Sequence, residues 1–300
     1  MGLKKVIANP KFYVILAIGR ILPRNEWGDK IFLKLLYKNR MKRALNLETP
    51  KFYNEKLQWI KLFDRNPRYT GLVDKYEVKN IVTNLIGADY VIPTLGVWDR
   101  FEDIDFKSLP QKFVLKCTHD SGGIVVCKDK DSLNLEEVKQ IINHSLKRDY
   151  YLNTREWPYK EVKHRIIAEQ YISGADGGIP VDYKFFCFDG EPDCVMLCVG
   201  REYGHPKFYF YDMEWKRKLY QKPDIEPSIE DTMMKPDNFD EMVEIVKKLA
   251  KGFAEVRVDL YNVDGVIYFG EYTFFNQSGL DVEISEDTDM YWGSKTILHK

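Results

Sequence analysis

Residues 254–275 have the sequence AEVRVDLYNVDGVIYFGEYTFF, which predicts a β-hairpin. Two strand-like runs flank the segment Asn262–Gly265, and its Asp-Gly pair is a strong turn signal. Along the first run, small or apolar residues alternate with Glu255, Arg257 and Asp259. Because successive side chains of a strand point to opposite faces, these three charged residues share one face of the predicted sheet.

The turn predicts which residues of the two strands lie opposite each other. A three-residue loop over Val263–Gly265, with its glycine in the left-handed conformation, places Arg257 opposite Glu271 and Asp259 diagonal to Glu271. Glu271 and Thr273 are then expected on one face of the second strand together with Ile267, Phe269 and Phe275. Neighbouring carboxylates repel unless a cation lies between them, and oxygen ligands suit Mg²⁺. The alternative, which this pattern alone favours, is a surface ion pair with one leftover acid.

A second motif, residues 113–126, has the sequence FVLKCTHDSGGIVV. Lys116 lies in an apolar run and is followed by Ser121, Gly122 and Gly123. Small residues let backbone N–H groups approach an anion, and lysine supplies a point charge. The motif is not a Walker A loop, because its lysine precedes the glycines and no helix follows them. It predicts an anion-binding loop, although taken alone it favours an ordinary hairpin turn.

Two further strand-like runs carry charged residues. Glu169 follows three small or apolar residues at the end of the run 166–170, where it could accept a hydrogen bond from an adenine amino group. The alternative is an acid on an edge strand. Asp182 and Lys184 share one face of a later strand, and the alternative there is a cross-strand ion pair.

The composition is that of a folded globular chain of about two domains. Hydrophobic residues make up 44% of the 300 residues, and the net charge of −1 argues against a uniformly basic nucleic-acid binder. The 5 cysteines lack CxxC spacing and the 5 histidines lack zinc-ligand spacing, so we expect buried, reduced thiols and no transition-metal site. No apolar run reaches the ~20 residues of a membrane span, and no signal peptide is evident. We therefore expect a cytoplasmic location.

The first 43 residues are strongly basic. They contain eleven Lys and Arg but only two acids, Glu26 and Asp29, and bulky apolar residues are interleaved with the basic ones. Such a segment suits a peripheral contact with an anionic membrane, such as the inner face of the plasma membrane. The favoured alternative is a helical unit that packs on the rest of the protein with its lysines solvated.

The order of predicted elements indicates an α+β fold with mostly antiparallel sheets. Helices dominate up to about residue 90, and short strands dominate from about residue 91. The expected helices span 29–44, 49–63 (with Thr49 as its cap), 74–86, 134–146 and 239–251. The expected strands span 113–117, 124–128, 165–170, 182–188, 194–199, 208–211, 254–261 and 266–275.

Taken together and in this order, the motifs resemble the TupA-like (teichuronopeptide biosynthesis) ATP-grasp family, which is linked to polysaccharide synthesis. The resemblance covers roughly residues 70–300. The matching pieces are Asp74-Lys75-Tyr-Glu-Val-Lys, Ile92-Pro-Thr-Leu-Gly-Val, Leu109-Pro through Lys116, the Ser-Gly-Gly loop, Ile167-Ala-Glu169, Asp182-Tyr-Lys-Phe-Phe, Val256-Arg-Val-Asp-Leu-Tyr and Phe269-Gly-Glu-Tyr-Thr-Phe. No single piece is decisive, but their joint order and spacing are specific.

The resemblance implies a role for each matching residue. Lys75 and Lys116 would contact the ATP phosphates, and the flap over the triphosphate would contain His119, Ser121, Gly122 and Gly123. Adenine and ribose would be bound by Glu169, Gln170, Ile172 and Asp176. The catalytic cations would be Arg257, Lys116 and Lys184. Asp259 and Glu271 would hold Mg²⁺; where many relatives have an asparagine this chain has Thr273, so Thr273 or Asn276 is expected as the third ligand.

The same resemblance implies the domain organisation and the activity. The expected units are a helical, basic segment (1–70), a pre-ATP-grasp region (71–110), a small lobe with the glycine flap (111–172) and a large lobe with the metal site (173–300). The implied reaction uses ATP to join a carboxylate to an amine through an acylphosphate, with a uronic-acid-containing surface or capsular polysaccharide, or its precursor, and an amino acid or amine as substrates. Two alternatives remain: a sugar or glycan kinase on the same scaffold, and a non-catalytic component that binds glycan or nucleotide.

Overall fold

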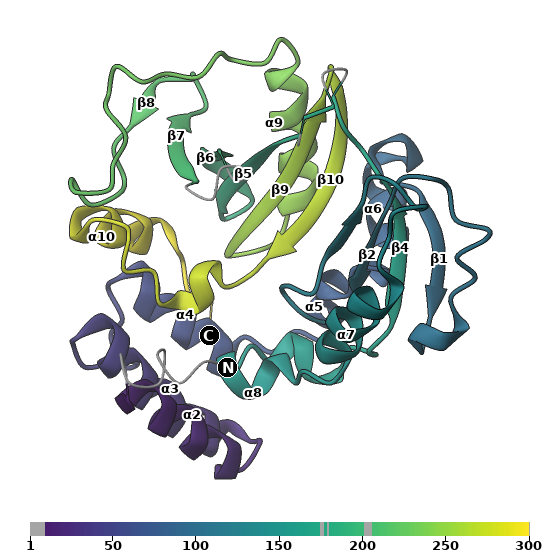
Figure 1. Ribbon diagram of the computed structural model, residues 1–300. Coiled ribbons are helices and arrows are strands. Elements are labelled where there is room, and N and C mark those ends of the chain that lie inside the picture. The colour runs from purple at the N-terminus through teal and green to yellow at the C-terminus, as the bar shows by residue number, and fades with distance from the viewer. Residues whose placement is uncertain (1–9, 175–176, 179, 201–205, 300) are drawn as a thin grey trace.

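Two antiparallel sheets frame the protein in a computed structural model, which describes residues 10–174, 177–178, 180–200 and 206–299 (Figure 1). The larger sheet contains β5 (Val181–Phe188), β6 (Glu191–Val199), β7 (Lys207–Asp212), β8 (Arg217–Lys218), β9 (Glu255–Val263) and β10 (Val266–Thr273), in the order β10-β9-β5-β6-β7-β8. The smaller sheet contains β1 (Thr94–Trp98), β2 (Phe113–Cys117), β3 (Val125–Cys127) and β4 (Ile166–Gln170), in the order β1-β4-β2-β3.

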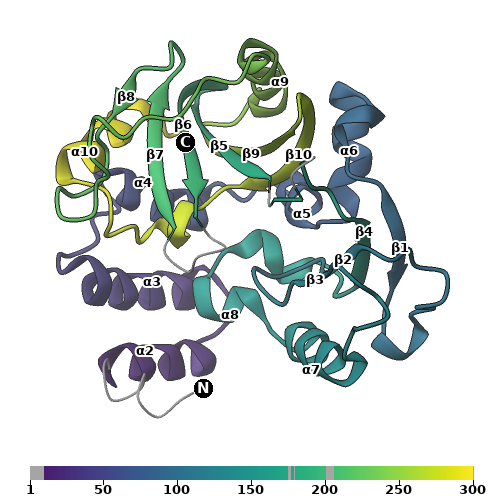
Figure 2. The same cartoon turned by 45° about the horizontal axis from the view of Figure 1, so that its top comes forward.

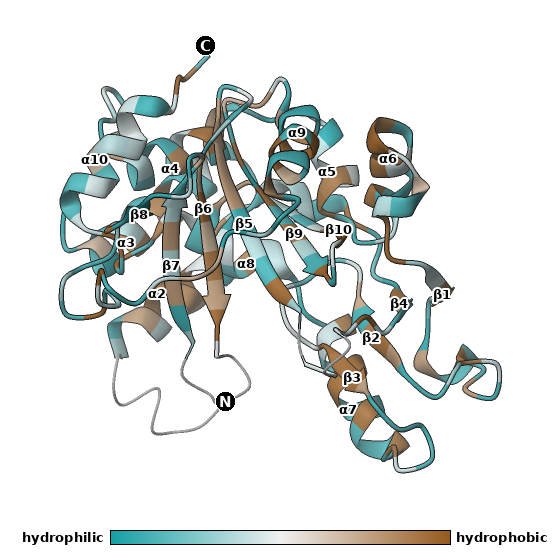
Figure 3. Cartoon of the chain, turned by 90° about the horizontal axis from the view of Figure 1, so that it is seen from above, coloured by the Kyte–Doolittle hydropathy of each residue, from teal (hydrophilic) through white to brown (hydrophobic). Residues whose placement is uncertain are grey.

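The larger sheet has one apolar and one polar face at its centre. Helix α9 (Phe239–Ala250) packs against β9, and Val256, Val258 and Leu260 are buried in the same core as the apolar side of the helix. Figure 3 shows apolar residues along β5, β6 and α9. Because side chains alternate along a strand, Arg257 and Asp259 lie on the opposite face, as the sequence predicts.

The smaller sheet is covered on one face by helix α7 (Leu135–Leu146). The side chain of Asn134 caps this helix by accepting a hydrogen bond from the Glu137 backbone N–H at 3.3 Å. The inward residues of β2 alternate and form a second apolar core with Val138 and Ile142 of the helix; they are Phe113, Leu115 and Cys117. Lys116 therefore lies on the uncovered face of this sheet.

The remaining helices lie beside the two sheets (Figures 1 and 2). They are α2 (Pro10–Ile21), α3 (Glu26–Met41), α4 (Tyr53–Phe63), α5 (Arg68–Val73), α6 (Glu77–Ile86), α8 (Tyr150–Thr154) and α10 (Glu286–Lys295). Helices α2 and α3 share a third apolar core with Leu62 of α4. Asp29 of α3 is buried and accepts a hydrogen bond from Arg65 at 2.8 Å. The inner faces of α2 and α3 therefore pack on the rest of the protein, as the helical-unit alternative for the basic segment predicts.

Two further sequence expectations concern cysteines and membrane spans. All five cysteines are free and buried, as predicted. Among the described residues, no helix has both the length and the apolar character that crossing a bilayer requires.

The helix expected from Thr49 begins four residues later, at Tyr53. The Thr49 hydroxyl accepts a hydrogen bond from the Asn46 side-chain amide at 3.0 Å, so it belongs to a local loop and caps no helix. The backbone N–H groups of Lys51 and Phe52 are instead satisfied by Glu55, whose Oε2 lies 3.0 and 3.3 Å away. A side chain from inside the helix thus defines its start.

The predicted hairpin is present, but its predicted register is wrong. Val263 pairs with Val266, so the loop has two residues, Asp264 and Gly265, both with positive φ (51° and 87°). Two left-handed residues in a row are typical of the tight hairpin turn that matches strand twist. As a result Asp259 lies opposite Glu271, and Arg257 lies opposite Thr273.

A bulge at Gly270 shifts the register and reverses the faces of β10. The ladder jumps between Phe269 and Glu271, which leaves Gly270 as the extra residue. A Cβ at Gly270 would lie 3.0 Å from the Asp259 carbonyl oxygen, which explains why a glycine fits here. Ile267 and Phe269 are buried, whereas Glu271 is exposed, so the prediction that they share a face is also wrong.

Candidate active site

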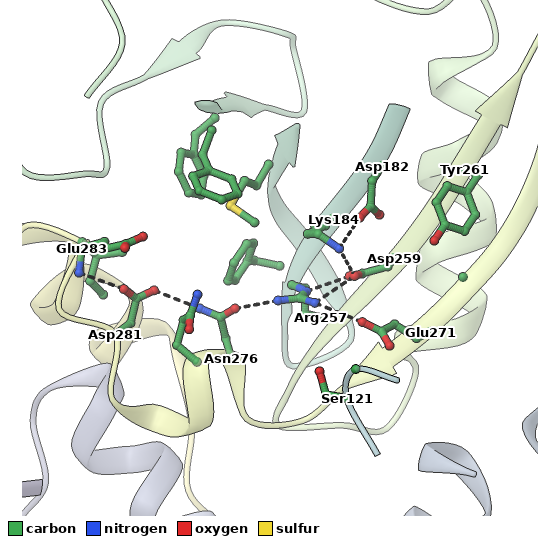
Figure 4. Close-up of a pocket in the computed structure, with 18 of the residues that line it drawn as sticks. Ser121, Asp182, Lys184, Arg257, Asp259, Tyr261, Glu271, Asn276, Asp281 and Glu283 are labelled. Atoms are coloured by element: carbon green, nitrogen blue, oxygen red, sulfur yellow. Dashed lines mark hydrogen bonds and ion pairs between the residues drawn. The ribbon is translucent and has the colours of Figure 1, made fainter. Parts of the chain in front are cut away.

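A buried charge cluster lies on the face of the larger sheet opposite α9 (Figure 4). Arg257 Nε donates to Asp259 Oδ1 at 2.7 Å, and its Nη2 donates to Oδ2 at 2.8 Å. Lys184 on β5 lies opposite Asp259 and forms ion pairs with it and, at 2.6 Å, with Asp182. Burial raises the pKa of Asp259, but Arg257 and Lys184 outweigh burial and bring this pKa below its ordinary value. Asp259 is therefore ionised at neutral pH.

Glu271 brings a second carboxylate to this cluster. It is directly opposite Asp259 in the β9–β10 ladder, and its Oε1 lies 3.5 Å from Arg257 Nη2. Its side chain is 48% exposed, so it retains contact with solvent. Magnesium is commonly held by one or two carboxylates together with phosphate oxygens and water. The donor set of Asp259 and Glu271 fits a Mg²⁺ ion that is bound together with a phosphate chain.

The third metal ligand expected from the sequence is not supported by the structure. Thr273 Oγ1 accepts a hydrogen bond from Arg257 Nη2 at 3.0 Å, and Asn276 Oδ1 accepts one from Arg257 Nη1 at 2.6 Å. The Asn276 amide also donates to Asp281 Oδ2 at 3.1 Å. Both side chains therefore hold the guanidinium in place. In the part of the chain that the structure describes, no group of three or more His, Cys, Asp and Glu side chains is arranged to hold a metal ion.

Lys75 reaches the cluster from the connection between α5 and α6. The helix expected over 74–86 is interrupted here, because Asp74 Oδ1 accepts hydrogen bonds from the backbone N–H groups of Tyr76 and Glu77. Arg165 donates to Asp74 Oδ2 at 2.8 Å and anchors this connection to the smaller sheet. The Lys75 ammonium then donates to the Asp120 carbonyl at 2.5 Å. Burial lowers the pKa of Lys75.

A cavity of about 380 Å³ joins these groups. Its basic lining residues come from both sheets and from the connection between α5 and α6: Lys75, Lys116, Lys184 and Arg257. Ser121 and Gly122 of the glycine loop form part of its wall, as expected for a flap. Four cations lie here beside three carboxylates, Asp182, Asp259 and Glu271, and the cations suit a polyanion such as a triphosphate.

Two expected flap residues do not face this cavity. His119 is buried, stacks on His164 with ring centroids 3.5 Å apart, and contacts the Arg148 carbonyl through Nε2 at 3.2 Å. Burial and His164 lower the pKa of His119 to about 4. Gly123 faces α7, since a Cβ there would lie 2.5 Å from Ser145. The sequence shows which residues form the loop but not which side of it they occupy.

Glu169 lies inside the smaller sheet, between β1 and β2, and not on an edge strand. Its carboxylate forms ion pairs with Lys79 at 2.8 Å and with Lys116 at 2.5 Å. Burial raises the pKa of Glu169, but Lys116 and Lys79 lower it below its ordinary value. Glu169 is therefore an ionised group that positions two lysines and retains free lone pairs toward the adjoining cavity.

A second cavity, of about 280 Å³, lies beside the first and is mostly apolar. Its lining includes Glu169, Gln170 and Ile172, three of the four residues expected at the nucleoside. Both cavities are lined by Lys116, Ile124 and Tyr261, so they are adjacent. The fourth expected residue, Asp176, lies outside the described residues. A mostly apolar cavity next to a cationic one could take the apolar and the anionic parts of one ligand.

Several site residues were not found from the sequence. Lys79 belongs to the motif that begins at Asp74, but nothing in the chain indicates that it contacts Glu169, ninety positions away. The rest of the lining of the larger cavity was also missed. Phe186 and Met196 lie opposite Arg257 and Lys184 in the sheet, and the other lining residues include Phe208, Phe210, Gln221, Asp281, Glu283 and Ile284. Only the alternation of Phe186 with Lys184 in β5 could have indicated one member of this group.

Comparisons with solved structures find two D-alanine–D-alanine ligases and a synthetase among the similar chains. A D-alanine–D-alanine ligase from Bacillus anthracis complexed with ATP is 17% identical, with a TM-score of 0.40 over 68% of this chain and 53% of the ligase. A D-alanine–D-alanine ligase from Helicobacter pylori is 12% identical, with a TM-score of 0.45 over 82% and 69% of the two chains. D-cycloserine synthetase DcsG is 14% identical, with a TM-score of 0.42 over 76% and 69%. The chain thus spans about half the length of the first of these ligases.

Family comparison is more specific. A search of curated proteins finds no match. The family described as TupA-like ATPgrasp matches residues 55–297, which is most of the chain and includes both sheets. The chain belongs to the TupA-like ATP-grasp family and has its α+β fold, with mixed helices and antiparallel sheets.

Proposed function

We propose that this protein is an ATP- and Mg²⁺-dependent carboxylate–amine ligase. One observation carries the proposal: three cations from the two sheets, Lys75 from the connection between α5 and α6, and two carboxylates of one hairpin surround a single cavity beside an apolar slot. Nucleophilic serine or cysteine chemistry is not needed, because phosphoryl transfer depends mainly on positioning and charge neutralisation.

Several residues of the two cavities have roles in this proposal. The apolar slot would take the adenine, with the backbone of Gln170 and Ile172 at its edge. Lys75 and Lys116 would bind the phosphates, and Asp259 and Glu271 would hold the metal ion. When bound, Mg²⁺ neutralises charge on the transferring phosphoryl group. Arg257, held by Thr273 and Asn276, would stabilise the same charge from the protein side.

The loop around Ser121 and Gly122 has a second task in this proposal. An acylphosphate hydrolyses if water reaches it, so a ligase must exclude solvent while the amine attacks. The loop borders the cavity and is tied to α7 through Asp120, which accepts a hydrogen bond from Ser145 at 2.8 Å. By family resemblance, the carboxylate belongs to a uronic-acid-containing polysaccharide or its precursor.

The proposal is tested by ADP release from the full chain. With Mg²⁺-ATP, glucuronic acid and a mixture of amino acids, we expect ADP release that requires both a carboxylate and an amine. Lys116→Ala should abolish it, whereas Lys163→Ala, an exposed lysine paired with Asp99, should not change it. ADP release with a hydroxyl acceptor alone would indicate a kinase, and absence of any ATP turnover would indicate a binding protein; either result contradicts the ligase proposal.

A further inference from the structure

The larger cavity is electrostatically asymmetric. All four of its basic lining residues cluster near the glycine loop and β9, together with Asp182, Asp259 and Glu271. The far end is lined by Asp281 and Glu283, and Figure 4 shows both on the opposite side of Asn276 from the Arg257 cluster. Among the described residues, neither carboxylate has a Lys, Arg or His within ion-pair distance. This end of the cavity therefore carries uncompensated negative charge.

The polar groups of this end have unused hydrogen-bonding capacity. Asp281 is buried and accepts hydrogen bonds from Asn276 Nδ2 at 3.1 Å and from the Glu283 backbone N–H at 3.0 Å, and the Ile284 backbone N–H also interacts with its carboxylate. A carboxylate can accept about four hydrogen bonds, so it has room for one further donor. Gln221 also lines the cavity, is only 7% exposed, and its Oε1 has no hydrogen-bond partner. A buried amide oxygen without a partner is costly unless a ligand satisfies it.

Apolar side chains complete the wall. Phe186 and Phe210 are buried in the main core, and Met196 and Phe208 pack against it, so all four present fixed apolar surface to the cavity. Aromatic faces attract cations, and thioether and ring edges accept aliphatic or aromatic chains. An ammonium group has three donors and no acceptor, which matches two carboxylates and an orphan amide oxygen.

We propose that the far end of this cavity binds the amine substrate, as a primary ammonium group on an apolar chain. Asp281, Glu283 and Gln221 receive the ammonium, and the four apolar side chains receive the chain. The inference rests on the proposed ligase function. A uronate or another anion is excluded from this end by the two carboxylates.

The position suits attack on an acylphosphate formed near Arg257, because Asn276 bridges Arg257 and Asp281 through two hydrogen bonds. The ammonium group first passes one proton to a carboxylate, which frees its lone pair. The nitrogen then forms the new C–N bond as the acyl C–O bond breaks, phosphate leaves with the bonding electron pair, and the second proton of the nitrogen leaves with the phosphate. Burial raises the pKa of Asp281, which favours its role as the proton acceptor.

The test uses three probes of similar size: 2-phenylethylamine, 2-phenylethanol and 3-phenylpropionate. Binding to the full chain without nucleotide is followed by calorimetry or NMR. We expect the amine to bind about 10-fold or more tightly than the alcohol, since a hydrogen bond to a charged group is strong, and the carboxylate to bind weakest. Glu283→Gln, at an exposed position that should fold normally, should remove most of this preference; Asp287→Asn, an exposed acid in the first turn of α10, should not.

Equal binding of amine and alcohol, tighter binding of the carboxylate, tighter binding of glucose, or displacement of the amine by Mg²⁺ alone would each overturn the inference. Failure of the ligase proposal gives a different result. If no combination of carboxylate and amine gives ADP release, the ligase function is refuted. If ADP is released but the KM for the amine is the same in Asp281→Asn and Glu283→Gln as in the unchanged protein, only this amine site is refuted.

A separate observation concerns the outer faces of α2 and α3. Ile21 is 83% exposed and Trp27 is 61% exposed, and Val14 and Leu35 are also exposed. A groove between the two helices is lined by Val14 and Leu35 together with basic residues, namely Lys11, Lys38 and Lys42. Exposed apolar residues gathered on one structural unit indicate an interaction surface.

The charge of this surface indicates its partner. Helix α2 contains no acid, and of the two acids in α3, Glu26 and Asp29, the second is buried against Arg65. The inner faces already pack in their own core, so the outer residues are not needed for folding. We infer that this surface rests on a bilayer of anionic lipid, with Trp27 and Ile21 at headgroup level and the lysines at the lipid charges.

Sedimentation of the full chain with vesicles tests this surface. We expect binding to phosphatidylcholine vesicles that contain phosphatidylglycerol, little binding to pure phosphatidylcholine, and a loss on adding salt. Lys11→Glu with Lys38→Glu should weaken binding about 10-fold or more, and Ile21→Gln with Trp27→Gln should weaken it as well, while ATP turnover is unchanged. Met234→Gln, at a 91% exposed site elsewhere, is the control. Unchanged binding in both pairs, equal binding to neutral vesicles, or self-association through these residues would overturn the inference.

Discussion

Asp259 and Glu271 should respond differently to the loss of one charge, although both are assigned to the same metal ion. Asp259→Asn and Glu271→Gln each replace a carboxylate with an amide of the same shape. They therefore test charge and metal binding with little change in packing. The two side chains differ in burial and in the number of their partners.

The stability effects follow from these partners. Asp259 is 2% exposed and receives Arg257 through two hydrogen bonds, at 2.7 and 2.8 Å, as well as Lys184. Removing its charge breaks the ion pairs of two buried cations, which then retain only Asp182 beside Lys184 and the 3.5 Å contact of Arg257 with Glu271. Breaking such a buried pair costs about 3–5 kcal/mol. Glu271 is half-exposed, and its contact with Arg257 spans 3.5 Å. Such a half-exposed ion pair contributes less than about 1 kcal/mol to the free energy of unfolding.

Activity should fall in both variants. If both carboxylates hold Mg²⁺ against the phosphates, removing either should lower Mg²⁺-dependent ADP release by about 100-fold or more at fixed metal concentration, and added Mg²⁺ should restore part of it. Urea unfolding gives the stability of each protein, and a coupled assay of ADP release gives the activity. Glu271→Gln should thus be folded and inactive.

The control is Glu244→Gln, which removes an exposed glutamate paired with Lys247 on α9. It should change neither measurement. Near-normal turnover by Glu271→Gln at low Mg²⁺ would refute its assignment to the metal. A stability loss of several kcal/mol in the same variant would instead refute the view that its side chain is a solvent-contacting, weakly paired group.

Three further outcomes are expected. Burial raises the pKa of Glu255 to about 8 from an ordinary 4.5. Between pH 4.5 and pH 8 the folded protein therefore keeps a proton on Glu255 that the unfolded chain releases, so the free energy of unfolding falls as the pH rises. Glu255→Gln preserves a partner for the Tyr53 hydroxyl and should remove this decline, which is at most about 1.4 kcal/mol per pH unit. Urea unfolding at pH 5, 6.5 and 8 measures it, and an equal decline with pH in both proteins would contradict the prediction. Gly270→Ala should destabilise the protein by about 1–3 kcal/mol and lower ADP release, because its methyl group meets the Asp259 carbonyl; normal values for both would show that the bulge adjusts freely. Lys79→Met should lower the free energy of unfolding by about 3 kcal/mol, and a double-mutant cycle with Glu169→Gln should show coupling between the two residues. If the two losses of stability simply add, the 2.8 Å ion pair of Lys79 with Glu169 contributes nothing to stability.

Local patterns in the sequence determined the elements and much of the site. Alternation along residues 254–261 is a property of the extended backbone, so the shared face of Arg257 and Asp259 could be predicted from the order of residues alone. The Asp-Gly turn, the helical spacing of α7 and α9, and the lysine before the glycine loop are equally local. Their order along the chain is what made the family resemblance specific.

Tertiary structure alone decided which of these groups meet. The bulge at Gly270 reversed the faces of β10, because one extra residue moves every following side chain to the other face of the strand. No turn residue in the sequence indicates this bulge. Thr273 and Asn276 were expected to bind metal but hold Arg257, and His119 stacks on His164, since a side chain's partner depends on what packs beside it. The ion pair of Lys79 with Glu169 and the acidic end around Asp281 bring together residues far apart in the chain. Sequence periodicity specifies a face within one element, whereas contacts between elements arise only when the apolar faces are buried against each other.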